Sequence, residues 1–163
     1  MYAVKNITLF QDYKTKVENA VLVFQEGKVL ASGKVTIPKN AVVIDGNGSF
    51  VYPSFVYPYA NLGVEKAKRN EYNSGSIYLP TDATSSAYND AVKADTRAVN
   101  SFTNQSKDFQ EYLNQGFGSV LSFNEDGIVR GSAVLIGLGQ GISAEKVIKE
   151  DAGFMLSLNK GSS

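Results

Sequence analysis

Short runs of apolar and β-branched residues, separated by turn residues, occupy the first fifty positions of the chain. Such runs suit a pleated, half-buried surface, and they predict strands at 2–10, 19–25, 28–31, 42–45 and 49–52. Two of these strands are separated only by Glu26-Gly27, and glycine tolerates the positive φ that a two-residue hairpin turn needs. Several short strands at this spacing predict a compact β-sandwich or barrel-like unit.

The pattern changes after Pro53, where a brief strand at 55–57 leads into a polar region. Residues 70–89 are rich in Ser, Thr, Asn and Tyr and predict a long loop, of the kind that is either functional or disordered. Residues 90–99 carry a helical spacing too weak to define their state.

A helix followed by a strand is the clearest local unit of the second half. Ser106 suits the N-cap and Gly116 the C′ position, with Phe109 and Tyr112 on one face between them. The apolar run 117–123 then predicts a buried strand. Helix, glycine stop and apolar strand are typical of a β/α-layered fold with parallel strands.

The last forty residues again predict strands. Residues 133–138 form an apolar strand, and 147–148 with 154–158 form a hairpin around a turn at 150–153. A single helix–strand unit cannot close a barrel or cover both faces of a parallel sheet. We therefore expect the chain to be part of a larger protein.

Composition restricts the chemistry that is available. The chain has 163 residues, 16 basic and 16 acidic, and contains no His, Cys or Trp. Nucleophile systems that need His or Cys, disulfides and Cys or His zinc sites are therefore excluded. The zero net charge argues against nucleic acid as a partner, since phosphate binding depends on a basic excess.

The sequence predicts no transmembrane segment, because no apolar run approaches the ~20 residues needed to cross a bilayer. Residues 1–5 lack the basic and apolar regions of a signal peptide. An exported protein would therefore have lost its signal. The absence of cysteine is compatible with a reducing or an oxidising compartment.

Two short motifs resemble catalytic signatures without completing them. Gly137-Leu138-Gly139-Gln140-Gly141 lacks the third glycine of a dinucleotide loop, because Ile142 stands there, and no Walker lysine follows. A flexible turn after a strand is the better interpretation. Ser157-Leu158-Asn159-Lys160 has Ser-x-x-Lys spacing, but no companion motif accompanies it.

Carboxylates and tyrosines are the remaining candidates for chemistry. Glu125 and Asp126 precede Gly127, which favours a solvated turn over a glycosidase-like acid and base pair. Three further aspartates are scattered over the polar middle region, at Asp82, Asp90 and Asp95. Three tyrosines form a predicted aromatic cluster that either stacks on sugars or packs at a domain junction: Tyr52, Tyr57 and Tyr59.

The order of motifs in residues 1–63 resembles the entry to the barrel in the amidohydrolase superfamily, the imidazolonepropionase-like and dihydroorotase-like metal hydrolases. The resemblance is carried by Val43-Ile44-Asp45-Gly46-Asn47-Gly48-Ser49-Phe50-Val51-Tyr52-Pro53-Ser54-Phe55-Val56. Family members have "Val-Ile-Asp-x-x-Gly-x-x-Val-x-Pro-Gly-Phe-Ile-Asp-x-His-x-His" there. The passage 109–121 is similar to the step into the second barrel strand.

The resemblance implies an α+β, β-rich fold with two parts. Residues 1–52 would form an amino-terminal β-sandwich unit of amidohydrolase type. Residues 53–163 would begin an incomplete TIM-like β/α barrel, with the long polar loop and a β-hairpin insertion. Residues 94–138 are similar to exported bacterial relatives that pair a half without metal ligands with a half that has them, which favours a periplasmic location.

The departures from the family decide the expected site. The two metal-binding histidines of the family fall on Tyr59 and Asn61, and the preceding aspartate on Tyr57. Neither Tyr nor Asn normally replaces imidazole at a zinc-type centre. We therefore expect no catalytic, cofactor-binding or metal-binding residue in this chain, although the active parent class would use zinc or a similar divalent metal.

The resemblance predicts a noncatalytic amino-terminal portion of a hydrolase that acts on C–N bonds other than peptide bonds. Its partner would be the rest of the parent polypeptide or a second subunit that completes the barrel, and a homo-oligomer is a further option. The alternative function is a β-rich binding or interaction module that uses surface tyrosines. A hydrolase that uses carboxylates alone ranks last.

Overall fold

The computed structural model describes residues 1–65, 91–104 and 108–159. These residues divide into two compact units, Met1–Pro53 and Ser54–Ser163. The model is β-rich with few helices, in agreement with the predicted α+β class. The predicted loop 70–89, the predicted N-cap Ser106, Asp82 and Asp90 lie outside the described residues.

The first unit is a mixed five-stranded sheet with the order β3-β2-β1-β4 and a short β5 that also pairs with β1. The strands are β1 (Tyr2–Phe10), β2 (Lys16–Gln25), β3 (Lys28–Gly33), β4 (Val42–Asp45) and β5 (Phe50–Val51). β1 runs antiparallel to β2 and parallel to β4 and β5, and β2 runs antiparallel to β3. The predicted sandwich requires a second sheet, which stays a prediction.

Local sequence defines the turns of this unit. Glu26 and Gly27 both have positive φ, 51° and 73°, as a two-residue hairpin of type I′ requires. The predicted hairpin is therefore confirmed. The small core of the first unit consists of Ile7, Leu9 and Ala20. Many larger apolar side chains on the strands and the segment after them remain exposed: Val29, Leu30, Val42, Val43, Ile44, Phe50 and Tyr52.

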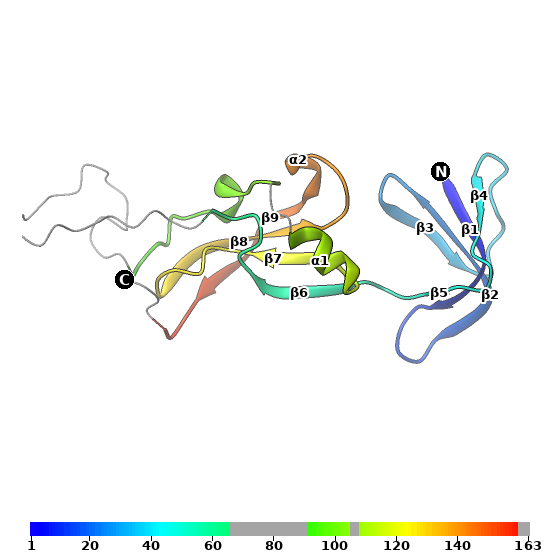
Figure 1. Cartoon of the computed structure of the whole chain (residues 1–163), viewed down its shortest axis with the longest axis horizontal. Coiled ribbons are helices and arrows are strands. Elements are labelled where there is room, and N and C mark those ends of the chain that lie inside the picture. Colours follow the sequence, from blue (N-terminus) through cyan, green and yellow to red (C-terminus); the bar gives the residue numbers. More distant parts are fainter. Residues whose placement is uncertain (66–90, 105–107, 160–163) are drawn as a thin grey trace, which may run out of the picture. The chain divides into compact units, whose positions relative to one another are not determined.

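The second unit is built on a four-stranded sheet with the order β6-β7-β8-β9 (Figure 1). The strands are β6 (Phe55–Ala60), β7 (Phe117–Ser122), β8 (Val129–Gly137) and β9 (Val147–Leu156). The helical elements are η2 (Ala98–Ser101), α1 (Asp108–Asn114) and α2 (Ser143–Lys146). β6 and β7 are parallel, whereas β7, β8 and β9 form an antiparallel meander.

The predicted helix–glycine–strand unit is confirmed as α1, Gly116 and β7. Gly116 has a φ of 92°, the left-handed conformation that glycine adopts at a helix C-terminus. Its amide donates to the carbonyl of Leu113 at 3.0 Å. The apolar side of α1 meets the sheet through the buried Phe109, which belongs to a core with Val120, Val134 and six other buried residues: Ala60, Leu62, Val64, Ala98, Ile136 and Leu138.

The predicted hairpin around residues 150–153 is wrong, because β9 continues from Val147 to Leu156 without a reversal. Contacts from other segments hold the middle of the strand extended. The Asp151 carboxylate accepts hydrogen bonds from Arg97 Nη2 at 2.6 Å and from Ser132 Oγ at 2.6 Å. The pairing with β8 is irregular here, with register shifts between Ala133 and Ile136.

In the second unit the described strands form one parallel pair, β6 and β7. The predicted β/α barrel stays a prediction. A segment from Val92 to Arg97 adds isolated parallel bridges to β8, at Val129 and Ser132. Among the described residues no helix is long and apolar enough to span a membrane.

Candidate functional site

Tyr59 is the first of the two residues that stand where the resembling family has a histidine. It lies on β6 and binds a buried arginine. Its Oη accepts a hydrogen bond from Arg130 Nη1 at 2.9 Å. Arg130 is 6% exposed, and its Nε donates to the Gly127 carbonyl at 3.0 Å. The Tyr59 ring meets the fully buried Phe123 edge-on, with ring centroids 4.8 Å apart. One tyrosine therefore links the aromatic core to a buried cation.

Asn61 is the second residue that stands where the resembling family has a histidine. It follows β6 and has a different partner. Its Nδ2 donates to Glu125 Oε2 at 2.9 Å. Glu125 therefore acts as an acceptor for an amide rather than as one member of an acid and base pair with Asp126. Asp126 itself forms an ion pair with Lys93, so the predicted solvated turn is in fact tied to the segment at residue 93.

The donor groups at these two positions do not fit a divalent metal ion. A guanidinium hydrogen-bonded to the Tyr59 hydroxyl repels a second cation at that oxygen. Asn61 donates its amide N–H to Glu125 and offers only a neutral amide oxygen in place of an imidazole, which is a poor ligand for a zinc-type ion. Within the described ranges, no group of three or more His, Cys, Asp or Glu side chains could hold a metal ion.

The three tyrosines predicted to cluster each pack against different rings. Tyr52 stacks on Phe10, with centroids 4.5 Å apart, inside the first unit. Tyr57 packs against Tyr112 at 5.4 Å, whereas Tyr59 meets Phe123. Within the second unit, Tyr57 and Tyr59 therefore pack against different partners, and the predicted cluster with Tyr52 stays a prediction. Pairing between β6 and β7 shifts register between Tyr57 and Ala60, which is where Pro58 removes a backbone N–H from the ladder.

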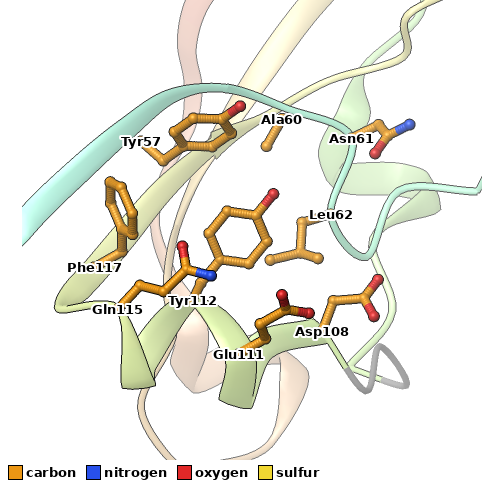
Figure 2. Close-up of a pocket in the computed structure, with 9 residues that line it drawn as sticks. All are labelled: Tyr57, Ala60, Asn61, Leu62, Asp108, Glu111, Tyr112, Gln115 and Phe117. Carbon is orange, nitrogen blue, oxygen red and sulfur yellow. The ribbon is translucent and has the colours of Figure 1, made fainter.

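A cavity of about 360 Å³ lies between the end of β6, α1 and the start of β7 (Figure 2). Its lining residues combine aromatic walls with amide and carboxylate groups: Tyr57, Ala60, Asn61, Leu62, Asp108, Glu111, Tyr112, Gln115 and Phe117. The Tyr112 hydroxyl points into the middle of this group of side chains. Sequence analysis placed Tyr57 on a surface but did not find this cavity, because it forms between segments far apart in the chain.

Burial and negative charge both act on the Tyr112 phenol. Partial burial is the main cause that raises its pKa, and the charges of Tyr57, Asp108, Glu111 and Glu125 add to it. The phenol therefore stays protonated over a wider pH range than a free tyrosine and can donate a hydrogen bond to a ligand. None of the lining side chains is basic.

An exposed cluster of opposite charges joins Arg97 to β9. Arg97 Nε donates to Asp151 Oδ1 at 3.1 Å, and Nη2 donates to Glu150 Oε2 at 3.0 Å. The hydrogen bond from Arg97 lowers the pKa of Asp151, with Ser132 contributing in the same direction. Both oxygens of Asp151 and one oxygen of Glu150 have a partner, which is the arrangement of a structural contact rather than of a general base.

Lys146 is a buried charged group that sequence analysis did not find. It is 8% exposed, and its Nζ lies 4.4 Å from the centroid of the Phe109 ring. Burial lowers its pKa. The contact with an aromatic face compensates part of the lost hydration of the ammonium group.

The two partial motifs lie in turns. Gly137 ends β8, and residues 138–141 lead from it into α2, with Gly141 at a φ of 147°. Ser157 Oγ accepts a hydrogen bond from the amide of Asn159 at 3.0 Å, so this hydroxyl closes a local turn. Lys160 lies outside the described residues, and the Ser-x-x-Lys geometry is not defined.

An amidohydrolase from Thermotoga maritima MSB8 is similar in structure, with a TM-score of 0.72 and 23% sequence identity. The match covers 96% of this chain and 38% of that one. At this identity the likeness concerns the fold alone.

Sequence comparisons give no further assignment. No family model matches the chain, and no curated protein matches it either.

Proposed function

We propose that this chain is the amino-terminal part of an amidohydrolase-like protein and does not catalyse hydrolysis by itself. The parent class hydrolyses C–N bonds other than peptide bonds with the help of a divalent metal. The likeness to part of the Thermotoga maritima amidohydrolase supports the fold assignment. The chain spans little more than a third of that protein's length. The hydrolase activity of the complete parent protein is therefore itself part of the proposal.

The hydrogen bonds at Tyr59 and Asn61 are the observation that carries the noncatalytic assignment. Both positions correspond to metal-binding histidines in the resembling family. In this chain Tyr59 accepts from the Arg130 guanidinium, and Asn61 donates to Glu125. The side chains that stand there therefore bind Arg130 and Glu125 and do not replace the two imidazole ligands.

The rest of the parent polypeptide or a second subunit is the proposed partner. Apolar side chains stay exposed on strands of both units, among them Val42 and Ile44 on β4 and Phe154 and Leu156 on β9. Exposed apolar surface on a sheet favours coverage by another protein layer. A partner that completes the barrel and the sandwich would bury such side chains.

A metal-content measurement tests the noncatalytic assignment. After dialysis against zinc chloride and then against zinc-free buffer, we expect elemental analysis to find well under one zinc per chain. We also expect no hydrolysis of a simple cyclic amide such as hydantoin above the buffer rate. The double variant Tyr59→His/Asn61→His is the matched comparison. One tightly held zinc per wild-type chain, together with hydrolysis, would contradict the proposal.

A binding module is the second candidate function, and the cavity between β6 and α1 favours it. Aromatic walls with amide and carboxylate groups are typical of sites for small polar ligands such as sugars. Calorimetric titration with an oligosaccharide panel tests this function. We expect a ligand that binds wild type to lose about tenfold in affinity when Gln115→Ala removes one rim amide. Equal affinity of both proteins would exclude the cavity as the binding site.

A further inference from the structure

Arg130 is a buried guanidinium whose hydrogen-bonding capacity is only partly used. A guanidinium carries five N–H donors. In this structure Nε donates to the Gly127 carbonyl and Nη1 to Tyr59 Oη. The remaining donors, including both on Nη2, have no acceptor among the described residues. Arginine that is 94% covered normally has a carboxylate partner, because removing a charge from water costs several kcal/mol.

The carboxylates closest in sequence to Arg130 are engaged elsewhere. Glu125 accepts from Asn61, and Asp126 is paired with Lys93. Because both carboxylates have other partners, Arg130 is a single positive charge without an ion-pair partner in the described part of the chain.

The free Nη2 donors are not sealed from solvent. Every fully buried side-chain nitrogen or oxygen among the described residues has a hydrogen-bond partner, so the uncommitted Nη2 is not fully buried. Tyr59, which is half exposed, contacts the guanidinium through its hydroxyl. The Tyr59 oxygen acts as an acceptor toward Arg130, which leaves its own O–H proton available to a second group.

We infer that Arg130 and Tyr59 form a binding site for a carboxylate. The 2.9 Å between Arg130 Nη1 and Tyr59 Oη is the hydrogen bond that joins the two side chains, so the uncommitted Arg130 N–H groups and the Tyr59 O–H lie close enough for each side chain to bind one of the two oxygens of a planar carboxylate. One positive charge matches one negative charge, whereas a phosphate dianion would keep an uncompensated charge in a largely desolvated place. This inference does not depend on the proposed function.

Arginine side-chain resonances of the full chain provide a direct test. The sequence has three arginines, Arg69, Arg97 and Arg130, so their Nε–Hε signals can be assigned with an Arg130→Lys variant. Sodium acetate is the probe, with sodium chloride at equal ionic strength as the control. We expect the Arg130 signal to shift saturably with acetate, whereas the Arg97 signal, paired with Asp151, stays in place.

A Tyr59→Phe variant tests the second donor. It keeps the ring against Phe123 and removes only the hydroxyl, so we expect the fold to persist and the affinity for acetate to fall about tenfold. A tripeptide with a free carboxy terminus is the second probe. Binding of both probes assigns the site to chain termini as well as to small carboxylates, whereas binding of acetate alone restricts it to small carboxylates.

Three results would overturn the inference. The first is an Arg130 signal that moves equally with chloride and acetate. The second is a Tyr59→Phe affinity equal to that of wild type. The third is tighter binding of inorganic phosphate than of acetate, which would indicate a general oxyanion site. The wild-type titration needs no variant to fold, so a destabilised Arg130→Lys protein does not prevent the test.

Discussion

Replacing Gly131 by alanine is expected to lower the free energy of unfolding of the second unit by more than about 3 kcal/mol. Gly131 lies on β8 at a φ of 79°, a conformation that L side chains rarely adopt. An added Cβ would lie 2.0 Å from the Thr96 carbonyl oxygen and 2.9 Å from that of Lys93. Both neighbours are backbone atoms, so the segment beside β8 would have to move.

Gly139→Ala is the matched control for this substitution. Gly139 follows β8 in the same unit, and an added Cβ there would have no neighbour within 4 Å. We expect a change below about 1 kcal/mol. Urea unfolding followed by circular dichroism measures both variants. Similar midpoints for the two alanine variants would show that the close approach of residues 93–96 to β8 is not required.

Replacing Phe123 by alanine is expected to cost about 3–5 kcal/mol of unfolding free energy. Phe123 is fully buried, and its ring meets Tyr59 edge-on. Its backbone amide donates to the Ala60 carbonyl at 2.9 Å, which joins the ends of β6 and β7. The truncation therefore leaves a cavity and also releases the ring of Tyr59 from the position in which it binds Arg130.

Phe154→Ala removes the same ring from an exposed position. Phe154 lies on β9 and is 56% exposed, so we expect a loss below about 1 kcal/mol. Thermal unfolding compares the two variants. A loss at Phe154 as large as at Phe123 would indicate that this face of β9 is buried in solution by another molecule.

Features coded by neighbouring residues could be predicted from the sequence. Glu26-Gly27 defines its turn through positive φ at adjacent positions, and Gly116 ends α1 by a local left-handed conformation. The apolar residues Phe109, Tyr112 and Leu113 share one face of α1, and this face likewise directs the helix onto the sheet. Each of these signals acts within one turn of chain.

Features that depend on distant partners could not be predicted. Residues 150–153 interrupt the apolar pattern and predict a turn, but Arg97 and Ser132 bind Asp151 and keep β9 extended. The separate packing of Tyr57 and Tyr59 has a similar cause, since Tyr57 faces Tyr112 on α1 while Tyr59 faces Phe123.

The candidate sites show the same division. Sequence identified Tyr59 and Asn61 as positions of interest through the family resemblance, but not their partners. The only available signal for Arg130 was a charged residue within the run Ile128-Val129-Arg130-Gly131. Such a residue is more often solvent-exposed than buried, and only the fold brings it to β6.

The parallel pairing of β6 with β7 closes a chain segment formed by residues 61–116. β7, β8 and β9 are instead successive antiparallel neighbours. Local pairs form sooner than distant ones, so the meander is expected to assemble first and β6 to dock last. Doubling the length of such a segment costs only about 0.6 kcal/mol of closure entropy. Insertions within residues 61–116 should therefore slow refolding more visibly than they lower equilibrium stability.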